Sequence, residues 1–245
     1  RFAEPSTAGT VESASLGMLV VLLLAPDLPV MMKMLVASTF ALAGTSLFLL
    51  ILQRVPLRST ILVPLIGLML GGVISACTTF FAYRFDLMQA MGAWTSGDFS
   101  TVLQGRYEVL WIAFVLTVAS YVAADRFTVA GMGQDFATNL GLHYGRVLAF
   151  GLVVVSMVTA SVVVTAGILP FIGLIVPNLV SIVMGDKLRH TLPWIALSGA
   201  ALVLVCDIVG RTVNAPFEVP AGSVLGVIGS LFFLNMLLRR RLRAA

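Results

Sequence analysis

The chain has 245 residues, of which 59% are hydrophobic and only 11% are charged, and its formal net charge at pH 7 is +4. Its mean hydropathy of +1.05 lies well above the range of water-soluble domains. This composition excludes a soluble domain and predicts an all-α polytopic membrane protein, whose basic residues serve membrane topology rather than nucleic-acid binding.

Apolar runs bounded by proline, glycine and charged residues predict eight membrane helices, since a spanning helix needs roughly 17–25 residues. The first is short, so we expect it to be displaced in the membrane or packed inside the bundle. We interpret residues 1–245 as one transmembrane domain. The predicted helices lie near residues 13–25, 30–52, 60–82, 104–123, 144–165, 168–184, 192–210 and 220–238.

Two polar connections contain apolar residues at helical spacing. Residues 84–103 predict a short helix lying in the membrane interface. The loop 123–146 contains a second amphipathic stretch, Gln134–Leu140, between glycines. On periodicity alone this stretch is equally an interfacial helix or a small helix presented to a partner protein.

The distribution of basic residues predicts the orientation. Most of the 15 Lys and Arg residues, including the Arg239–Arg243 cluster, fall on one side of the predicted spans. The positive-inside rule makes that side cytoplasmic, so both chain ends are expected in the cytoplasm. Tryptophan and tyrosine residues fall near the predicted helix ends, where amphipathic rings prefer to lie.

Asp207 is the one acidic residue placed well inside a predicted span. A carboxylate costs about 2.5–3.5 kcal/mol at mid-helix and less near the end, so it needs a partner. Arg211 follows four residues later on the same helix face and can form an ion pair with it. The local pair is the favoured interpretation; a docking role for Arg211 and a proton relay are alternatives.

The sequence lacks the motifs of bond-making chemistry. It has no GxxxxGK[ST] loop to hold ATP phosphates, and no GxSxG or HExxH pattern. Cys77 and Cys206 lie in apolar runs, away from any metal-ligand spacing, and are expected to be packed thiols. We therefore expect a protein that is not an enzyme, with no cofactor and no metal site.

Glycine and proline positions suit a transporter without identifying one. Gly67–Gly71 and Gly222–Gly226 have small-xxx-small spacing, which predicts close helix packing. Pro64 and Pro177 lie inside predicted spans, where proline kinks a helix. Because Asp207 is the only ionisable residue expected near mid-membrane, an ion-coupled secondary transporter has few candidate coupling groups.

Several motifs, found in order along nearly the whole chain, resemble the permease subunits of ABC importers for ferric siderophores, haem and cobalamin (the FecCD type). They are FAEPSTAGTVESASLG, GQDFATNLG, FIGLIVPN, MGDKLRHTLP, ALSGAALVLVCDIVGR and FEVPAGSVLGVIG. The Pro177-Asn178 pair, where many members have Pro-His, resembles the catecholate-siderophore branch.

The resemblance implies a ten-helix permease of which about eight helices are present and the first two are missing. It implies three kinds of partner: a second permease subunit, identical or related; two ATPase subunits; and a periplasmic or lipid-anchored binding protein. The expected function is the transmembrane permease of an ATP-driven importer that moves a ferric siderophore across the bacterial inner membrane. An ion-coupled secondary transporter acting without an ATPase is the alternative.

The resemblance also implies site residues. Arg211, with Glu218 beside it, matches the position that docks the binding protein on the outer face, and the inner gate maps near Ser59 and Thr60. The ATPase coupling loop maps to Gly133, Gln134, Asp135, Ala137, Leu140 and Gly141.

Overall fold

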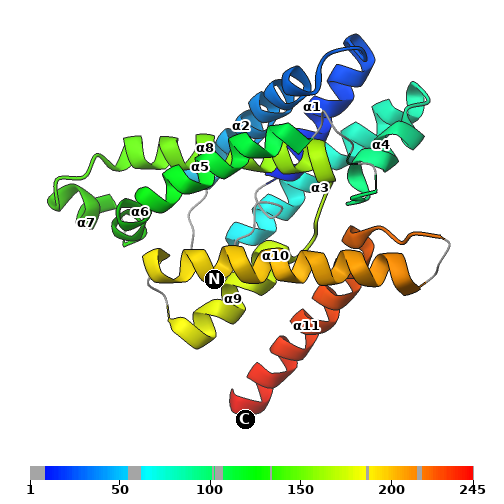
Figure 1. Ribbon diagram of the computed structural model, residues 1–245. Helices are drawn as coiled ribbons and strands as arrows, with labels where there is room; N and C mark the ends of the chain where they lie inside the picture. The colour runs from blue at the N-terminus through cyan, green and yellow to red at the C-terminus, as the bar shows by residue number, and fades with distance from the viewer. Residues whose placement is uncertain are drawn as a thin grey trace.

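The computed structural model describes residues 9–54, 62–100, 102, 107–132, 134–185, 188–213 and 217–244. Within these residues all regular structure is helical, which confirms the predicted fold class (Figure 1). The α-helices are α1 (Thr10–Leu24), α2 (Val30–Arg54), α3 (Leu62–Arg84), α4 (Met88–Thr95), α5 (Leu110–Val122), α6 (Ala124–Ala130), α7 (Gln134–Asn139), α8 (Tyr144–Ala166), α9 (Ile172–Met184), α10 (Leu188–Val213) and α11 (Ala221–Ala244). A 3₁₀ turn, Tyr107–Val109, precedes α5.

Eight apolar segments correspond to the eight predicted spans. Among the described residues, four helices, α2, α3, α8 and α10, are long and apolar enough to cross a membrane. The turn Tyr107–Val109 with α5 and α6 makes a fifth candidate, bent by 62°. Helices α1 and α9 and the Ala221–Phe232 part of α11 are apolar but shorter.

Several predicted helix starts differ from the structure by three or more residues, including 192, where α10 begins at Leu188. The segment predicted at 168–184 begins at Ile172, because Pro170 disfavours helical backbone before it and Phe171 adopts a left-handed φ of 64°. The helix predicted from residue 13 begins at Thr10, and the Ser13 amide donates to the Gly9 carbonyl at 3.1 Å. Glu12 therefore lies inside α1 rather than at its boundary.

The sequence also failed to predict α6. The charged pair Asp125–Arg126 marks the end of the apolar run, yet the chain resumes as helix at Ala124 after a break at Ala123. Charged side chains end a membrane span, but they do not end a helix, because the backbone hydrogen bonds continue in water.

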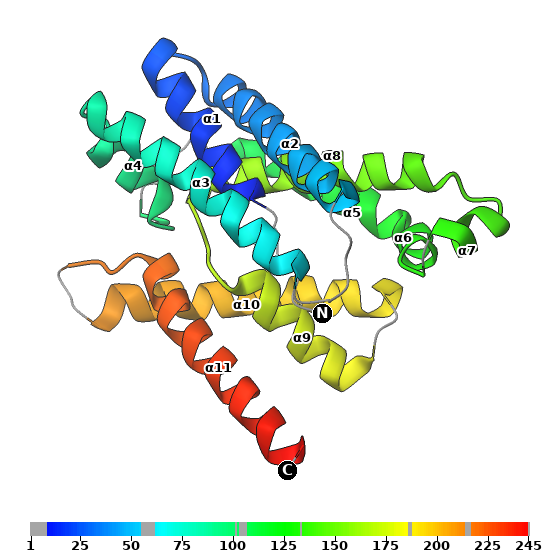
Figure 2. The same ribbon diagram turned by 180° about the vertical axis from the view of Figure 1, so that it is seen from behind.

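Helices α1, α2 and α8 form the centre of the bundle, and small residues line their contact. The core contains Ala14 of α1, Ala37 and Ala41 of α2, and Ala160 of α8, all fully buried. A buried hydrogen bond of 2.8 Å joins the hydroxyls of Thr10 and Thr45 across α1 and α2. Figures 1 and 2 show α9, α10 and α11 as a second group beside this centre.

One contact ties the second group to the rest of the bundle at the start of α11. The Gly222 amide donates to the Gly97 carbonyl at 3.0 Å. A Cβ atom on Gly222 would lie 2.7 Å from the Ser96 carbonyl oxygen and 2.9 Å from that of Ile168. Three backbone segments therefore meet where only glycine fits, which confirms the close packing predicted for Gly222.

We predict that Gly222→Ala destabilises the protein by about 1–3 kcal/mol, because the added methyl group meets backbone atoms that have little room to move. The measurement is thermal unfolding of the purified protein in detergent. Gly72→Ala is the matched control, since Gly72 lies in α3 and a Cβ atom added there would have no neighbour within 4 Å. Equal unfolding temperatures for the two variants would contradict the prediction.

Candidate functional site

Arg211, near the end of α10, lies between two carboxylates. Its Nε atom donates to Asp207 Oδ2 at 3.0 Å, and its Nη1 atom lies 3.7 Å from Glu218 Oε1. The structure confirms the predicted pair of Asp207 and Arg211 along the helix and brings Glu218 to the same place. A guanidinium has five N–H donors, so these two contacts do not use all of them.

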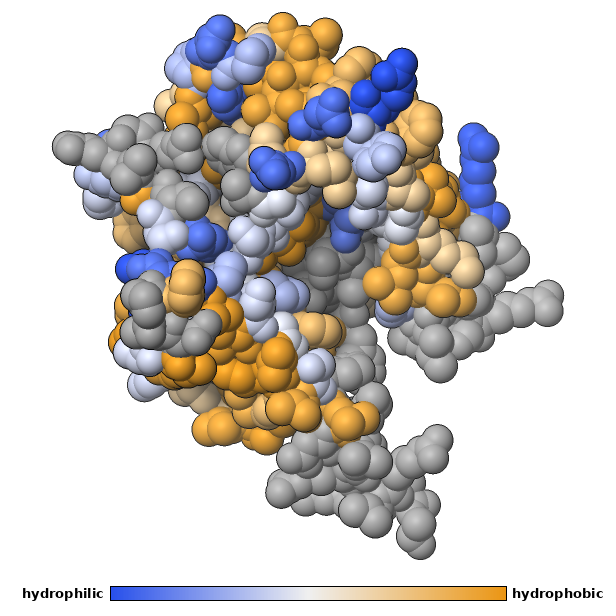
Figure 3. Space-filling model, turned by 90° about the vertical axis from the view of Figure 1, so that its right-hand side faces the viewer, coloured by the Kyte–Doolittle hydropathy of each residue, from blue (hydrophilic) through white to orange (hydrophobic). Residues whose placement is uncertain are grey.

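This cluster orients Arg211 more than it stabilises the fold. The Arg211 and Glu218 side chains are nearly half exposed, and that of Asp207 is about a quarter exposed. Exposed i,i+4 ion pairs contribute only about 0.3–0.5 kcal/mol. Figure 3 views the molecule from the side where α4 lies, and hydrophilic residues gather across the upper part of that face between hydrophobic areas.

The segment predicted to couple to a partner forms the short helix α7. Ala137 is fully buried, whereas Phe136 is half exposed and Leu140, just after the helix, is more than half exposed. The side chains of Gln134 and Asp135 and the whole of Gly133 lie outside the described residues. Among its described side chains, α7 buries only Ala137 and leaves the apolar Phe136 exposed, next to the exposed Leu140.

Gly141 ends α7 in a left-handed conformation. Its φ is +78°, its amide donates to the Thr138 carbonyl at 2.9 Å, and the Leu142 amide donates to the Ala137 carbonyl at 3.0 Å. This is the glycine-terminated helix cap in which a left-handed residue satisfies the last carbonyls. A residue with a side chain is strained at that φ, so glycine defines the end of α7.

Two contacts hold the neighbouring helix α6. The rings of Phe127 in α6 and Phe150 in α8 stack with centroids 6.1 Å apart and planes 13° apart. Arg189 Nη1 of α10 lies 2.6 Å from Asp125 Oδ2 of α6. The segment that carries α7 is thus attached to both α8 and α10.

The remaining predicted residues fall elsewhere. Ser59 and Thr60, predicted as an inner gate, lie outside the described residues. Cys206 is buried as predicted, but Cys77 is exposed on α3, so the prediction of a packed thiol is wrong there. Only one face of α3 packs against the bundle, and Cys77 lies on another.

Sequence reasoning missed Glu12. It lines a cavity of about 320 Å³ between α1, α3 and α4, together with several serine and threonine residues. The signal was present in the run TVESASLG, where Glu12 and Ser15 are three residues apart on one helix face. Treating the glutamate as the boundary of a span concealed it.

A larger cavity of about 570 Å³ lies between α9, α10 and α11 and is almost wholly apolar. Its one serine, Ser198, already donates its hydroxyl to its own helix at the Trp194 carbonyl. The polar groups among its lining residues are the Ser198 oxygen and the indole N–H of Trp194.

The sequence matches known proteins along nearly its whole length. A sequence profile of the FecCD transport family matches residues 1–240. The chain is 51% identical to the petrobactin import system permease protein YclN of Bacillus subtilis over 241 residues, which cover 98% of this chain and 76% of that protein. It is 45% identical to the petrobactin import system permease protein FatD of Bacillus anthracis, covering 98% and 72%.

Two further similarities extend the comparison. The ferric-anguibactin transport system permease protein FatD of Vibrio anguillarum is 43% identical, with coverage of 98% of this chain and 76% of that protein. The fold is similar to a solved structure described as a metal-chelate type ABC transporter in an inward-facing conformation. The TM-score is 0.77 at 21% identity, covering 97% of this chain and 77% of the other.

Proposed function

Since the chain belongs to the FecCD transport family, we propose that it forms half of the pathway through which an ATP-driven importer moves a catecholate-type ferric siderophore across the bacterial inner membrane. It is a multi-pass permease of an ABC import system for iron siderophores, and a transport component rather than an enzyme. The observation that carries the cargo proposal is the 51% identity to a petrobactin import permease over 98% of the chain.

An ABC import system has ATPase and binding-protein partners. We assign to this chain a second permease, identical or related, two ATPase subunits on the cytoplasmic side, and a periplasmic or lipid-anchored binding protein on the other side. The excess of basic residues at the Arg239–Arg243 end supports a cytoplasmic C-terminus. The ion-coupled secondary transporter loses its support, because the family match is to an ABC permease.

Helix α7 and its glycine cap are suited to receive the ATPase. The exposed Phe136 and Leu140 provide an apolar contact surface on the outside of a helix that is anchored by Ala137. The stack of Phe127 on Phe150 and the ion pair of Arg189 with Asp125 connect the neighbouring segment to two long helices. Displacement of α7 by the ATPase would therefore move α8 and α10 with it.

Arg211 is suited to bind a carboxylate of the binding protein. Asp207 holds Nε at 3.0 Å, while the Glu218 contact of 3.7 Å is longer and easier to exchange. A carboxylate from the partner would replace Glu218 and leave the Asp207 pair intact. Glu218 thus keeps the guanidinium oriented until the partner arrives.

The proposed function is tested by transport with purified components. The full-length permease, its ATPase and its binding protein are reconstituted in proteoliposomes, and uptake of a radiolabelled ferric catecholate siderophore is followed. We expect uptake with ATP, none with an ATPase that cannot hydrolyse ATP, and no effect of a protonophore. Uptake that needs no ATP and collapses with the protonophore would refute the proposal.

We predict that Gly141→Pro abolishes ATP-driven uptake while the protein still inserts into the membrane. Proline fixes φ near −65°, whereas this position has φ of +78° and uses its amide as a donor, so the end of α7 is lost. Gly145→Ala is the control, because Gly145 lies four residues later with open space around it. Wild-type uptake by Gly141→Pro would remove the loop from the coupling mechanism.

We predict that Arg211→Glu weakens binding of the binding protein at least about tenfold, since breaking a charged hydrogen bond costs about 1.5–3 kcal/mol. The affinity is measured with the permease in nanodiscs. Arg84→Glu makes the same change of charge at an exposed position at the end of α3 and should bind normally. An unchanged affinity for Arg211→Glu would leave Arg211 only as the partner of Asp207.

A further inference from the structure

The chain passes from α8, in the centre of the bundle, to the second group of helices through a short linker, residues 167–171. Within the described residues this is the only place where the chain crosses from one group to the other. Figures 1 and 2 show the linker as an extended segment that leaves the end of α8 and enters α9. A change in its backbone conformation therefore changes how the two groups are joined.

Phe171, the last residue of the linker, has a backbone conformation that is rare for a bulky residue. Its φ is 64°, in the left-handed region that suits glycine. Its carbonyl accepts the amides of Leu174 and Ile175 at 3.1 and 2.9 Å, so α9 starts directly from this strained residue. Such conformations persist only where surrounding contacts fix them, and they gather at switch regions and functional sites.

Contact with α11 fixes Phe171. A Cβ atom on Gly229 would lie 2.7 Å from the Phe171 Cβ and 2.9 Å from its Cγ, closer than two such carbon atoms can approach. Gly229 is buried, and Phe171 is partly buried. Phe171 therefore occupies this place only because residue 229 has no side chain.

Two more glycines extend this contact along α11. Gly222, Gly226 and Gly229 are spaced by four and three residues, so they lie on one face of the helix. A Cβ atom on Gly222 would be 2.9 Å from the Ile168 carbonyl oxygen, whereas one on Gly226 would be 3.6 Å from Pro170 Cγ, which is an ordinary contact. The linker thus lies along a glycine face of α11, tightly at both ends and loosely in the middle.

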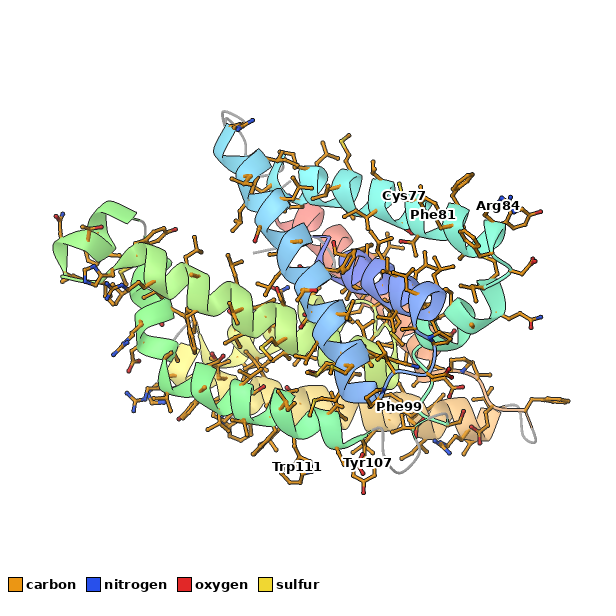
Figure 4. All side chains as sticks on the ribbon, turned by 90° about the horizontal axis from the view of Figure 1, so that it is seen from above. Cys77, Phe81, Arg84, Phe99, Tyr107 and Trp111 are labelled. Carbon is orange, nitrogen blue, oxygen red and sulfur yellow. The ribbon has the colours of Figure 1, made fainter. Side chains whose placement is uncertain are left out.

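The segment after α4 holds the end of the linker next to α8. Gly97 has a φ of +66°, and a Cβ atom there would lie 2.5 Å from the Ile168 carbonyl oxygen. The Gly97 carbonyl accepts the Gly222 amide at 3.0 Å. In Figure 4, Phe99 marks this segment just beyond Gly97. Because Ile168 is enclosed by two backbone segments, Phe171 is the part of the linker that has room to change.

We propose that Phe171 is a two-state latch between α9 and α11. In the state described here, the contact with Gly229 holds Phe171 in the left-handed conformation. When α11 moves away, Phe171 takes the ordinary right-handed conformation, and α9 begins at Pro170 rather than at Ile172. Pro170 is already suited to that position, because proline fixes φ near −65° and is favoured in the first turn of a helix.

The latch gives the bundle two discrete arrangements, as a conformational switch requires. The first state carries backbone strain and keeps the ring contact, whereas the second loses the contact and relieves the strain. Because α9 and α11 form two walls of the apolar cavity of about 570 Å³, the change of state alters the width of that cavity. The latch is a property of this chain alone and does not depend on the cargo or on the ATPase.

The test follows the Phe171 ring by fluorine nuclear magnetic resonance. The full-length permease is studied in nanodiscs, with 4-fluorophenylalanine in place of Phe171. We expect a major resonance from the latched ring and a minor one, in slow exchange with it, from the released ring. Gly229→Ala should raise the share of the minor resonance about tenfold or more, because the added methyl group overpacks the contact. Gly226→Ala, on the same face with an ordinary contact, is the matched control and should leave the ratio unchanged.

The position of the resonances separates a latch from a simple displacement of the ring. If Phe171 has two states, the major resonance of Gly229→Ala coincides with the minor resonance of the unmodified permease. A single resonance in the unmodified permease would overturn the proposal. So would a Gly229→Ala resonance at a chemical shift that the unmodified permease does not show, or an unchanged ratio in that variant.

A second pair of variants keeps the test valid if Gly229→Ala fails to fold. Phe171→Ala and Phe171→Gly both remove the ring, but only glycine adopts a left-handed φ without strain. We expect hydrogen exchange of amides 172–175, corrected for intrinsic rates, to be about fivefold slower in Phe171→Ala, because alanine favours the lengthened helix by about that factor. Equal or faster exchange in Phe171→Ala would overturn the proposal. Because neither measurement needs the ATPase or a siderophore, a negative result is separate from a failure of ATP-driven uptake.

Discussion

In lipid, an apolar side chain gains little by leaving the hydrocarbon for the surface of another helix, so the bundle depends on close backbone approach and on hydrogen bonds between helices. The alanines buried between α1, α2 and α8 meet the first requirement, and the bond between Thr10 and Thr45 meets the second. The same requirement acts at the start of α11, where Gly222 lets three backbone segments meet. This contact holds the segment after α4, at Ser96 and Gly97, and the segment before α9, at Ile168, against the start of α11.

Asp207 and Glu12 are both acidic residues in apolar helices, where a carboxylate is costly, but their surroundings differ. Asp207 lies near a helix end and has Arg211 on its own helix, so it is balanced locally. Glu12 lies inside α1 and beside the middle of α3, where the hydroxyls around the cavity donate their protons to backbone carbonyls. The first residue is paired along its own helix, while the second lines a cavity that three helices form together.

Sequence periodicity predicted the helices well and the sites unevenly, for physical reasons. Each of the eight apolar runs corresponds to an apolar helix or bent helix pair, but only four, or five with the bent pair, are long and apolar enough to span among the described residues. The pair of Asp207 with Arg211 was also predictable, since it depends only on helix geometry. The cavity at Glu12 was not predictable, because it depends on the relative placement of α1, α3 and α4. The start of α6 was also missed, because its charged residues mark the end of a membrane span but not the end of a helix.

Helix α10 connects the two ends of the molecule to which the proposed functions belong. Its 26 residues, with Pro193 in the second turn, form one helix about 39 Å long at 1.5 Å per residue. Arg189 at one end is paired with α6, next to the proposed coupling helix, and Arg211 at the other end belongs to the proposed docking cluster. If an ATPase displaces α6, we expect part of that displacement to reach Arg211 through α10. Release of the binding protein and ATP hydrolysis would then be linked through α10. After release, Glu218 would again form its contact with Arg211.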